Sequence, residues 1–254
     1  MSIVFLIIIL VALVVGSFLT VATEDPDGFD WLKRKRSKCA NCGHVLGARD
    51  LVPLFSYLWL KGKCRYCGKL IAPHHVLTEL ATVFLFLTAY VVAPKPLQTG
   101  FVFLLVMLTL LLALTLTDLK FWTLPDIFVG LLALVGIGRS IFLHQPNIAD
   151  GLAGAVAGFV LLGAVYFFSK GKAMGFGDVK LAAAMGLVLG FGQLLLALMF
   201  AFILGGLVGM VLIVLKKVTA KSMVPFGPFL TVATALLLLF PALYGRILLF
   251  YGLM

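Results

Sequence analysis

The chain has 254 residues and a net charge of +10, with 63% hydrophobic residues, 12% charged residues and a mean hydropathy of +1.17. Because soluble domains are only about half apolar, this composition excludes a soluble globular protein and favours one built for lipid. In a soluble protein such a positive charge would favour nucleic-acid binding, but a protein with several membrane spans uses Lys and Arg to set its orientation. We therefore expect a polytopic membrane protein with no nucleic-acid partner.

Apolar runs separated by charged breaks predict an all-α fold with about eight transmembrane helices. The first run lacks a basic region before it and a small-x-small cleavage site after it, so we expect a retained span rather than a signal peptide. The sixth run is too short to cross a bilayer core of ~30 Å at 1.5 Å per residue, so we expect it to be tilted, broken or sheltered by neighbouring helices. In chain order the predicted helices cover residues 2–22, 76–93, 100–117, 124–143, 149–168, 178–191, 193–215 and 226–250.

The Lys and Arg residues predict the orientation of these spans. With the N-terminus outside, 17 of the 20 basic residues lie in or beside the loops on the inner side. The positive-inside rule therefore predicts cytoplasmic loops at 23–75, 118–123, 169–178 and 216–225, and both termini outside.

Two C-x-x-C pairs lie in the first of these loops, Cys39 with Cys42 and Cys64 with Cys67, and 21 residues separate Cys42 from Cys64. Four thiolates presented by two such turns suit tetrahedral zinc. Disulfides are the competing interpretation, but a cytoplasmic loop is in a reducing compartment. A zinc ion with four protein ligands has no open position for substrate, so we expect a structural zinc that folds the loop.

Two aspartates, Asp118 at the end of the third span and Asp178 at the start of the sixth, are predicted at the inner ends of their helices. Charged groups at membrane depth are costly and usually functional. Two carboxylates that meet there can share one proton, so that one activates a water and the other protonates a carbonyl. The alternative is that both are helix caps or interface charges. Gly175 and Gly177 allow a close backbone approach at Asp178, whereas for Asp126, which follows Pro125, we favour a cap or an interface charge.

The residues alone leave two other classes of protein open. A proton-coupled transporter also uses membrane carboxylates, although both aspartates lie at one face and no chain of ionisable residues occupies the middle of the membrane. A zinc-binding scaffold of a pilus or secretion assembly would need no chemistry from either aspartate.

Several motifs in order carry a resemblance to a known family. The chain resembles the type IV prepilin leader peptidases, which are membrane aspartyl proteases of the G-x-G-D class, over nearly its whole length. Besides the cysteine pairs, the matching stretches are 16–19, 50–57, 62–65, 79–80, 117–118, 124–126, 175–181 and 225–230.

The resemblance implies removal of the short basic leader from prepilin-like proteins at the cytoplasmic face of the bacterial inner membrane, in type IV pilus or type II secretion systems. It implies Asp118 and Asp178 as the catalytic pair. The chain would then consist of a first span at 1–22, a zinc-binding loop at 23–75 and a peptidase core at 76–254. Many members also methylate the new N-terminus with S-adenosylmethionine. This chain departs from the family pattern at 20–25, so methylation is the weaker expectation.

The charges of the first loop predict its partners. A basic leader is not attracted to the basic run at 33–38, so we expect this run to bind anionic membrane lipids. We expect Asp50 and Glu79, which lie in matching stretches, to bind the leader. The alternatives are that Asp50 caps a turn of the loop and that Glu79 is an ordinary membrane-interface residue.

Overall fold

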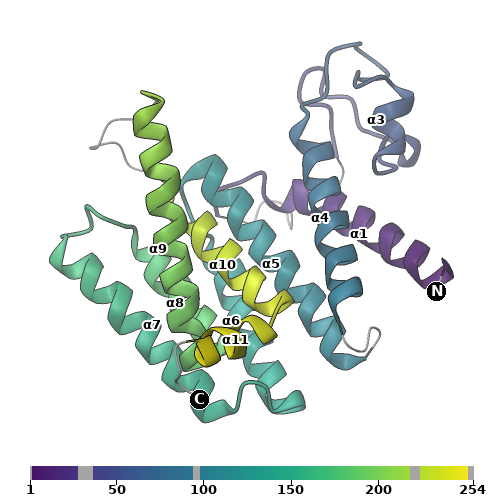
Figure 1. Cartoon of the computed structure of the whole chain (residues 1–254). Helices are drawn as coiled ribbons and strands as arrows, with labels where there is room; N and C mark the ends of the chain where they lie inside the picture. The colour runs from purple at the N-terminus through teal and green to yellow at the C-terminus, as the bar shows by residue number, and fades with distance from the viewer. Residues whose placement is uncertain (1, 28–36, 94–97, 218–223, 251–254) are drawn as a thin grey trace. The chain divides into compact units, whose positions relative to one another are not determined.

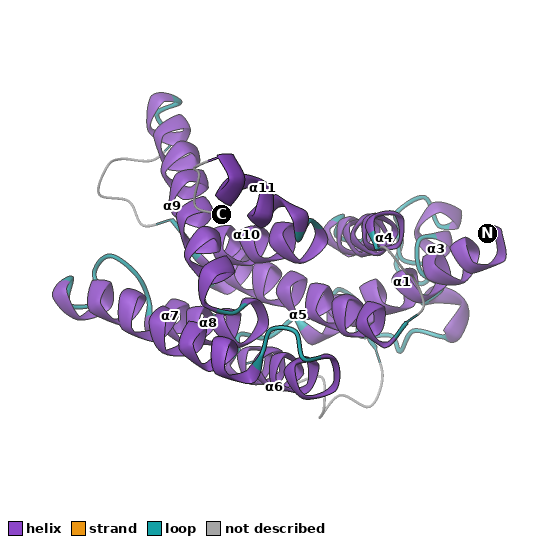
Figure 2. Ribbon diagram, turned by 60° about the horizontal axis from the view of Figure 1, so that its bottom comes forward, coloured by secondary structure: helices purple, strands orange, loops and turns teal. Residues whose placement is uncertain are grey.

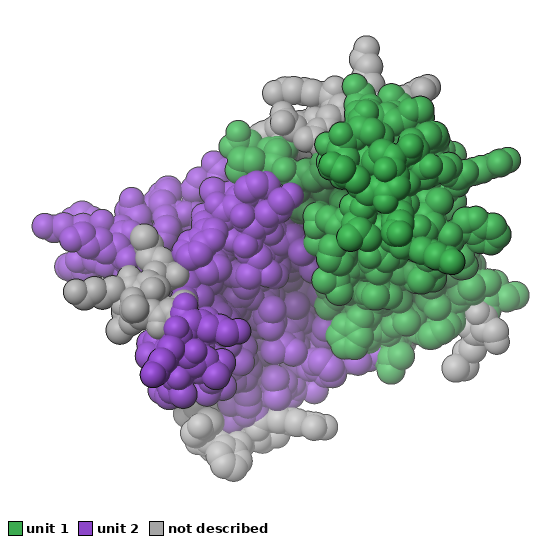
Figure 3. All heavy atoms as spheres, turned by 90° about the horizontal axis from the view of Figure 1, so that it is seen from above, with its two compact units in different colours: residues 1–91 green, residues 92–254 purple. Residues whose placement is uncertain are grey.

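A computed structural model describes residues 2–27, 37–93, 98–217 and 224–250 of the chain. The described residues form helices (Figure 1), joined by turns and without a β-strand (Figure 2). The all-α fold class is therefore confirmed. The chain divides into two compact units, residues 1–91 and 92–254, which are coloured separately in Figure 3.

The N-terminal unit has two long apolar helices with a structured loop between them. The helices are α1 (Ser2–Ala22) and α4 (His74–Val92). The loop contains one turn of 3-10 helix, η1 (Ala48–Asp50), and the short helix α3 (Phe55–Trp59).

The C-terminal unit is built around α8, which packs against α6, α7, α9 and α10. Nine of the 14 residues of α8 are buried, so other helices of the unit cover this helix on most of its sides. The helices of the unit are α5 (Thr99–Phe121), α6 (Asp126–Leu143), α7 (Ile148–Phe168), α8 (Phe176–Leu189), α9 (Phe191–Val214), α10 (Gly227–Leu239) and α11 (Ala242–Phe250).

Small residues allow α8 to pack closely against α7. A Cβ added at Gly158 of α7 would lie 2.5 Å from the carbonyl oxygen of Ala182, and one added at Gly186 of α8 would lie 2.2 Å from the carbonyl carbon of Gly154. Without side chains between them the two backbones gain van der Waals contact, which is how helices associate in lipid. The expectation that neighbours shelter the short sixth helix agrees with this packing.

The expected eight spans are not confirmed. Six described helices are long and apolar enough to cross a membrane, namely α1, α4, α5, α6, α7 and α9. The run at 178–191 forms the 14-residue α8, and the run at 226–250 is divided into α10 and α11. Pro241 follows the end of α10, and since proline lacks an N–H and clashes with the preceding turn, it prevents one continuous helix.

Candidate active site and cysteine centre

Asp118 lies in the last turn of α5, which is longer than the sequence predicts. The helix continues to Phe121, and Trp122 then ends it in the left-handed conformation with φ 60°. Asp118 is therefore fixed by a helical backbone on both sides, and its side chain is buried, with 5% exposed.

Asp178 is the third residue of α8 and caps the start of this helix. The backbone N–H of Gly175 donates to Oδ2 of Asp178 at 3.2 Å. The residue is 7% exposed. Asp178 therefore does cap its helix, as the alternative interpretation expects. The same carboxylate has further acceptor sites that remain for other partners.

The two carboxylates lie close enough for the charge of Asp118 to act on Asp178. Both belong to the C-terminal unit and both are buried. Two buried carboxylates that interact in this way favour a state in which they hold one proton between them. Such a pair can act as an acid and a base at the same time.

The start of α10 closes the site beside Asp118, and the sequence reasoning missed this. A Cβ added at Gly227 would lie 2.6 Å from Oδ2 of Asp118 and 3.2 Å from Cδ2 of Leu124. Leu124 also contacts Gly177, where an added Cβ would lie 3.3 Å from its Cβ. From the sequence, residues 225–228 are expected to form a turn before the last helix, and stretch 225–230 also belongs to the family resemblance. The sequence signal that could have indicated this close approach is the glycine between two prolines, Pro225 and Pro228, at the start of a helix.

Oδ2 of Asp118 is a buried acceptor without a hydrogen-bond partner among the described residues. It is buried and makes no hydrogen bond within the described part of the chain, although the backbone N–H of Gly227 lies beside the carboxylate. A hydrogen bond between Oγ1 of Thr115 and Oγ1 of Thr231, 2.7 Å long, fastens α10 to α5 about one turn away. The unpaired oxygen is an acceptor available to water or to a substrate.

Asp126 lies outside the buried pair. It is the first residue of α6 and forms an ion pair with Lys180 of α8, and the two side chains are 71% and 37% exposed. An exposed pair of this kind contributes about 0–1 kcal/mol to stability. Pro125 occupies the N-cap position of α6, so the interpretation of Asp126 as an interface charge agrees with this position and the interpretation as a cap does not.

The four cysteines of the loop come together as the spacing predicts. Their Sγ atoms all lie within 4.8 Å of one another, and Cys39 Sγ is 4.0 Å from Cys67 Sγ. All four are free. Zinc–sulfur distances of about 2.3 Å would place tetrahedral thiolates about 3.8 Å apart, so the cluster fits zinc with a small contraction.

Each cysteine pair forms the same kind of turn. The N–H of Gly43 donates to the carbonyl of Cys39 at 2.9 Å, and the N–H of Gly68 donates to the carbonyl of Cys64 at 2.9 Å. Gly43 and Gly68 have φ angles of 69° and 68°, which favour glycine. The backbone N–H groups of Cys42 and Asn41 lower the pKa of the Cys39 thiol to about 6, which favours the thiolate that a metal binds.

Asp50 connects η1 to the second cysteine turn. Its Oδ2 accepts the N–H of Gly47 at 3.0 Å and the hydroxyl of Tyr66 at 3.1 Å, and Nε of Arg65 pairs with Oδ1 at 2.8 Å. These contacts hold the pKa of Asp50 below its usual value, and the hydrogen bond from the N–H of Gly47 has a larger effect than those of Tyr66 and Arg65. The contact with Gly47 is the turn cap considered as the alternative role, whereas leader binding by Asp50 stays a prediction.

Glu79 joins three parts of the N-terminal unit. Its Oε2 accepts the N–H of Leu54 at 2.8 Å, and the hydroxyl of Ser17 also bonds to its carboxylate. A Cβ added at Gly16 would lie 2.7 Å from the Cα of Glu79, so α1 and α4 approach closely here. Glu79 is 7% exposed, and its proposed role in leader binding stays a prediction.

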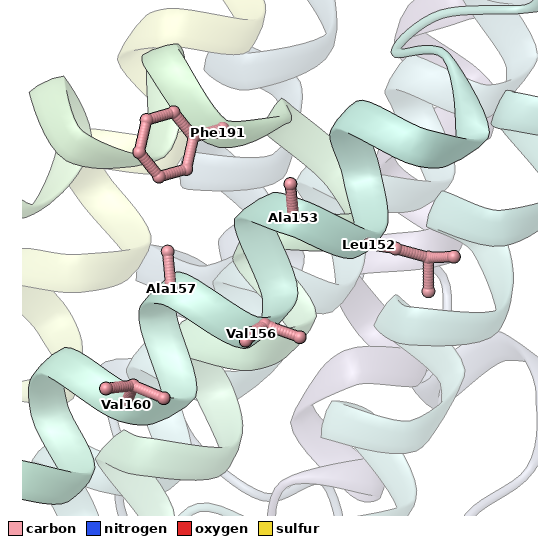
Figure 4. A pocket seen from close by; sticks show the side chains of 6 residues that line it. All are labelled: Leu152, Ala153, Val156, Ala157, Val160 and Phe191. Atoms are coloured by element: carbon pink, nitrogen blue, oxygen red, sulfur yellow. The ribbon is translucent and has the colours of Figure 1, made fainter.

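A pocket of the C-terminal unit is lined by apolar side chains of α7 and by Phe191 of α9 (Figure 4). It contains no acid, base or metal ligand, so it offers no chemistry. Its lining consists of Leu152, Ala153, Val156, Ala157, Val160 and Phe191.

The fold and its two clusters define a helical membrane protein with a buried aspartate pair and a four-cysteine loop. Residues 10–93 match the Bacterial Peptidase A24 N-terminal domain, and residues 105–210 match the Type IV leader peptidase family. The chain therefore belongs to the type IV leader peptidase family, which confirms the resemblance.

Curated relatives cover most of the chain. A prepilin leader peptidase/N-methyltransferase of Aeromonas hydrophila is 32% identical over 90% of this chain and 88% of its own length. Proteins with the same name from Pseudomonas aeruginosa and Klebsiella pneumoniae are 33% and 38% identical, over 78% and 59% of this chain and 69% and 67% of their own lengths. No solved structure matches the chain.

Proposed function

We propose that this protein is a membrane aspartyl endopeptidase that removes the basic leader from prepilin-like proteins, with Asp118 and Asp178 as its catalytic pair. The observation that carries the proposal is the buried pair of interacting carboxylates with one unpaired oxygen, Oδ2 of Asp118. The names of the relatives supply the class of substrate.

The reaction needs one proton in the pair at the start. The ionised carboxylate removes a proton from a water molecule, whose oxygen attacks the scissile carbonyl carbon, while the protonated carboxyl donates to the carbonyl oxygen. When the C–N bond of the tetrahedral intermediate breaks, the amine leaves with the proton that the base took from water. A hydroxyl of the intermediate gives its proton to the other carboxylate, so the pair again holds one proton. The unpaired Oδ2 of Asp118 suits the role of water acceptor, so we assign the base to Asp118.

The substrate must become extended around the scissile bond. A carbonyl inside a helix is already hydrogen-bonded, and a membrane-embedded helix satisfies all its backbone groups internally. A glycine before the cleavage site lowers the cost of this local unwinding, because glycine is a poor helix former.

The four cysteines would hold a structural zinc ion. Zinc would supply folding energy to a loop too small to have a core of its own, and Asp50 would orient the second cysteine turn through Tyr66 and Arg65. In this proposal the zinc takes no part in the cleavage.

N-methylation of the new N-terminus is a second candidate activity, because the relatives carry it in their names. It would use S-adenosylmethionine as the methyl donor. The departure of residues 20–25 from the family pattern makes this activity the one to test separately.

The enzyme would work at the inner membrane with its loop and catalytic pair on the cytoplasmic side and both termini outside. Prepilins or pseudopilins and membrane lipids would be its partners. The basic run at 33–38, proposed to bind anionic lipid, lies outside the described residues except for its last two positions. A leader bound by Asp50 or Glu79 would have to compete with the internal contacts of these carboxylates.

The deciding experiment incubates the purified protein with a prepilin, with and without S-adenosylmethionine, and measures the intact mass of the product. Loss of the leader mass supports the peptidase, and a further gain of one methyl group supports the transferase. A transporter or a non-catalytic scaffold would leave the prepilin at its original mass.

A further inference from the structure

The short helix α3 exposes an apolar face that nothing in the proposed function uses. Phe55, Leu58 and Trp59 are 65%, 66% and 86% exposed. Their spacing of three and four residues places them on one side of the helix. Three large apolar side chains gathered on one exposed face usually mark a surface that binds something.

The opposite side of α3 is occupied within the loop. The ring of Tyr57 lies over Gly62, where an added Cβ would be 3.1 Å from the ring. The N–H of Gly62 donates to the carbonyl of Tyr57 at 2.8 Å. The fold of the loop therefore holds α3 by its inner side and leaves the face of Phe55, Leu58 and Trp59 outward.

Glu79 places the start of α3 beside a membrane helix. The bond from the N–H of Leu54 to Oε2 of Glu79 joins the residue before α3 to the sixth residue of α4. Five residues of helix are about 7.5 Å long, so this contact lies near the start of a span. Leu54 has φ 61°, an unfavourable angle for a residue with a side chain, which the contact helps to fix. Thus α3 is tethered at the height of the membrane boundary.

The charge around α3 suits an anionic bilayer. Between residues 37 and 73 the sequence has six Lys or Arg residues and one acidic residue, Asp50. Lys61 and Lys63, directly after α3, are exposed. A zinc ion with four thiolates would add a charge of about −2 and leave the loop positive. Such a surface repels a basic leader and attracts anionic headgroups.

We propose that α3 is an interfacial helix that inserts Phe55, Leu58 and Trp59 into the anionic cytoplasmic leaflet, with the neighbouring lysines at the headgroups. Aromatic side chains with basic neighbours favour this boundary. The proposal concerns the loop and not the aspartate pair, so it can fail or succeed independently of the proposed peptidase activity.

Tryptophan fluorescence of the full-length protein tests the proposal. In a Trp31→Phe, Trp122→Phe protein, Trp59 is the only tryptophan, and thermal unfolding checks that the protein remains folded. The protein is reconstituted into vesicles containing phosphatidylglycerol, with lipids brominated near the headgroup end of their acyl chains. We expect the bromines to reduce the Trp59 emission about twofold, and aqueous iodide to reduce it far less.

A second arm tests the charge. Vesicles of phosphatidylcholine alone, or the added substitution Lys61→Gln, should weaken quenching by the brominated lipid. The proposal is overturned if iodide quenches Trp59 as it quenches free tryptophan while the brominated lipid does not. It is equally overturned if neither quencher reaches Trp59, because another protein surface then covers α3.

Discussion

At the scale of single residues, Asp118 and Asp178 are two buried carboxylates whose charges interact with each other. We expect Asp118→Asn and Asp178→Asn each to reduce prepilin cleavage by at least about 10³-fold, because an amide cannot exchange the proton that acid–base catalysis requires. The rate of leader removal in detergent or vesicles, followed by mass spectrometry, measures this effect.

Asp126→Asn is the matched control for this substitution. It makes the same chemical change at an exposed carboxylate that pairs with Lys180, so cleavage should stay close to that of the unaltered protein. Efficient leader removal by either Asp118→Asn or Asp178→Asn would show that the pair is not catalytic.

Gly227 gives a second prediction at this scale. In Gly227→Ala the new Cβ would lie 2.6 Å from Oδ2 of Asp118, so the carboxylate or the start of α10 must move. A displacement near 1 Å in a catalytic group can cost about 10²-fold in rate, so we expect kcat to fall by that order while KM changes little.

Gly206→Ala is the control, because nothing lies within 4 Å of a Cβ added at Gly206 of α9. It should retain both kcat and thermal stability. If Gly227→Ala cleaves as fast as Gly206→Ala, then the close approach to Asp118 has no catalytic importance.

At the scale of elements, the structure differs from the sequence expectations where packing decides the outcome. Hydropathy predicts the long helices well, since each needs only an apolar run of sufficient length. It also joins α10 to α11, because apolar residues flank Pro241 on both sides. The contact of Gly227 with Asp118 could not be predicted, because it depends on which helices pack together. The cysteine cluster could be predicted, since each C-x-x-C turn is a local structure.

In the loop of the N-terminal unit, the four cysteines should bind zinc as a set. Replacement of any one of the four cysteines by Ser should abolish stoichiometric zinc and expose the loop to protease, since metal binding and folding of such a small element are one event. Elemental analysis of the purified protein and limited proteolysis measure the two effects.

A substitution elsewhere in the loop is the control for this experiment. Ala40→Ser adds the same hydroxyl at an exposed position next to Cys39 and should leave zinc and protease resistance unchanged. Purified protein that contains no zinc after preparation without chelator would contradict the assignment of a zinc site.

At the scale of the whole molecule, three helix ends of the C-terminal unit meet at the aspartate pair that we propose to be catalytic. Asp118 lies at the C-terminal end of α5, whereas Asp178 and Gly227 lie at the N-terminal ends of α8 and α10. Helices that cross in opposite directions bring such ends to one side of the membrane. The positive-inside rule predicts that this side is the cytoplasmic one, because 17 of the 20 Lys and Arg residues lie in or beside the loops of that side.

This orientation predicts where reporter fusions will be active. Alkaline phosphatase, which is active only outside the inner membrane, should be active when fused after Gln145, between α6 and α7, and inactive when fused after Lys172, between α7 and α8. A cytoplasmic fluorescent reporter at the same two positions should give the opposite pattern, and immunoblots should show equal amounts of each fusion. The reverse result would put the ends of α5, α8 and α10 outside. The catalytic pair would then lie on the side of the membrane opposite the cytoplasmic leader, so the proposed cleavage at the cytoplasmic face would be wrong even if both aspartates were essential.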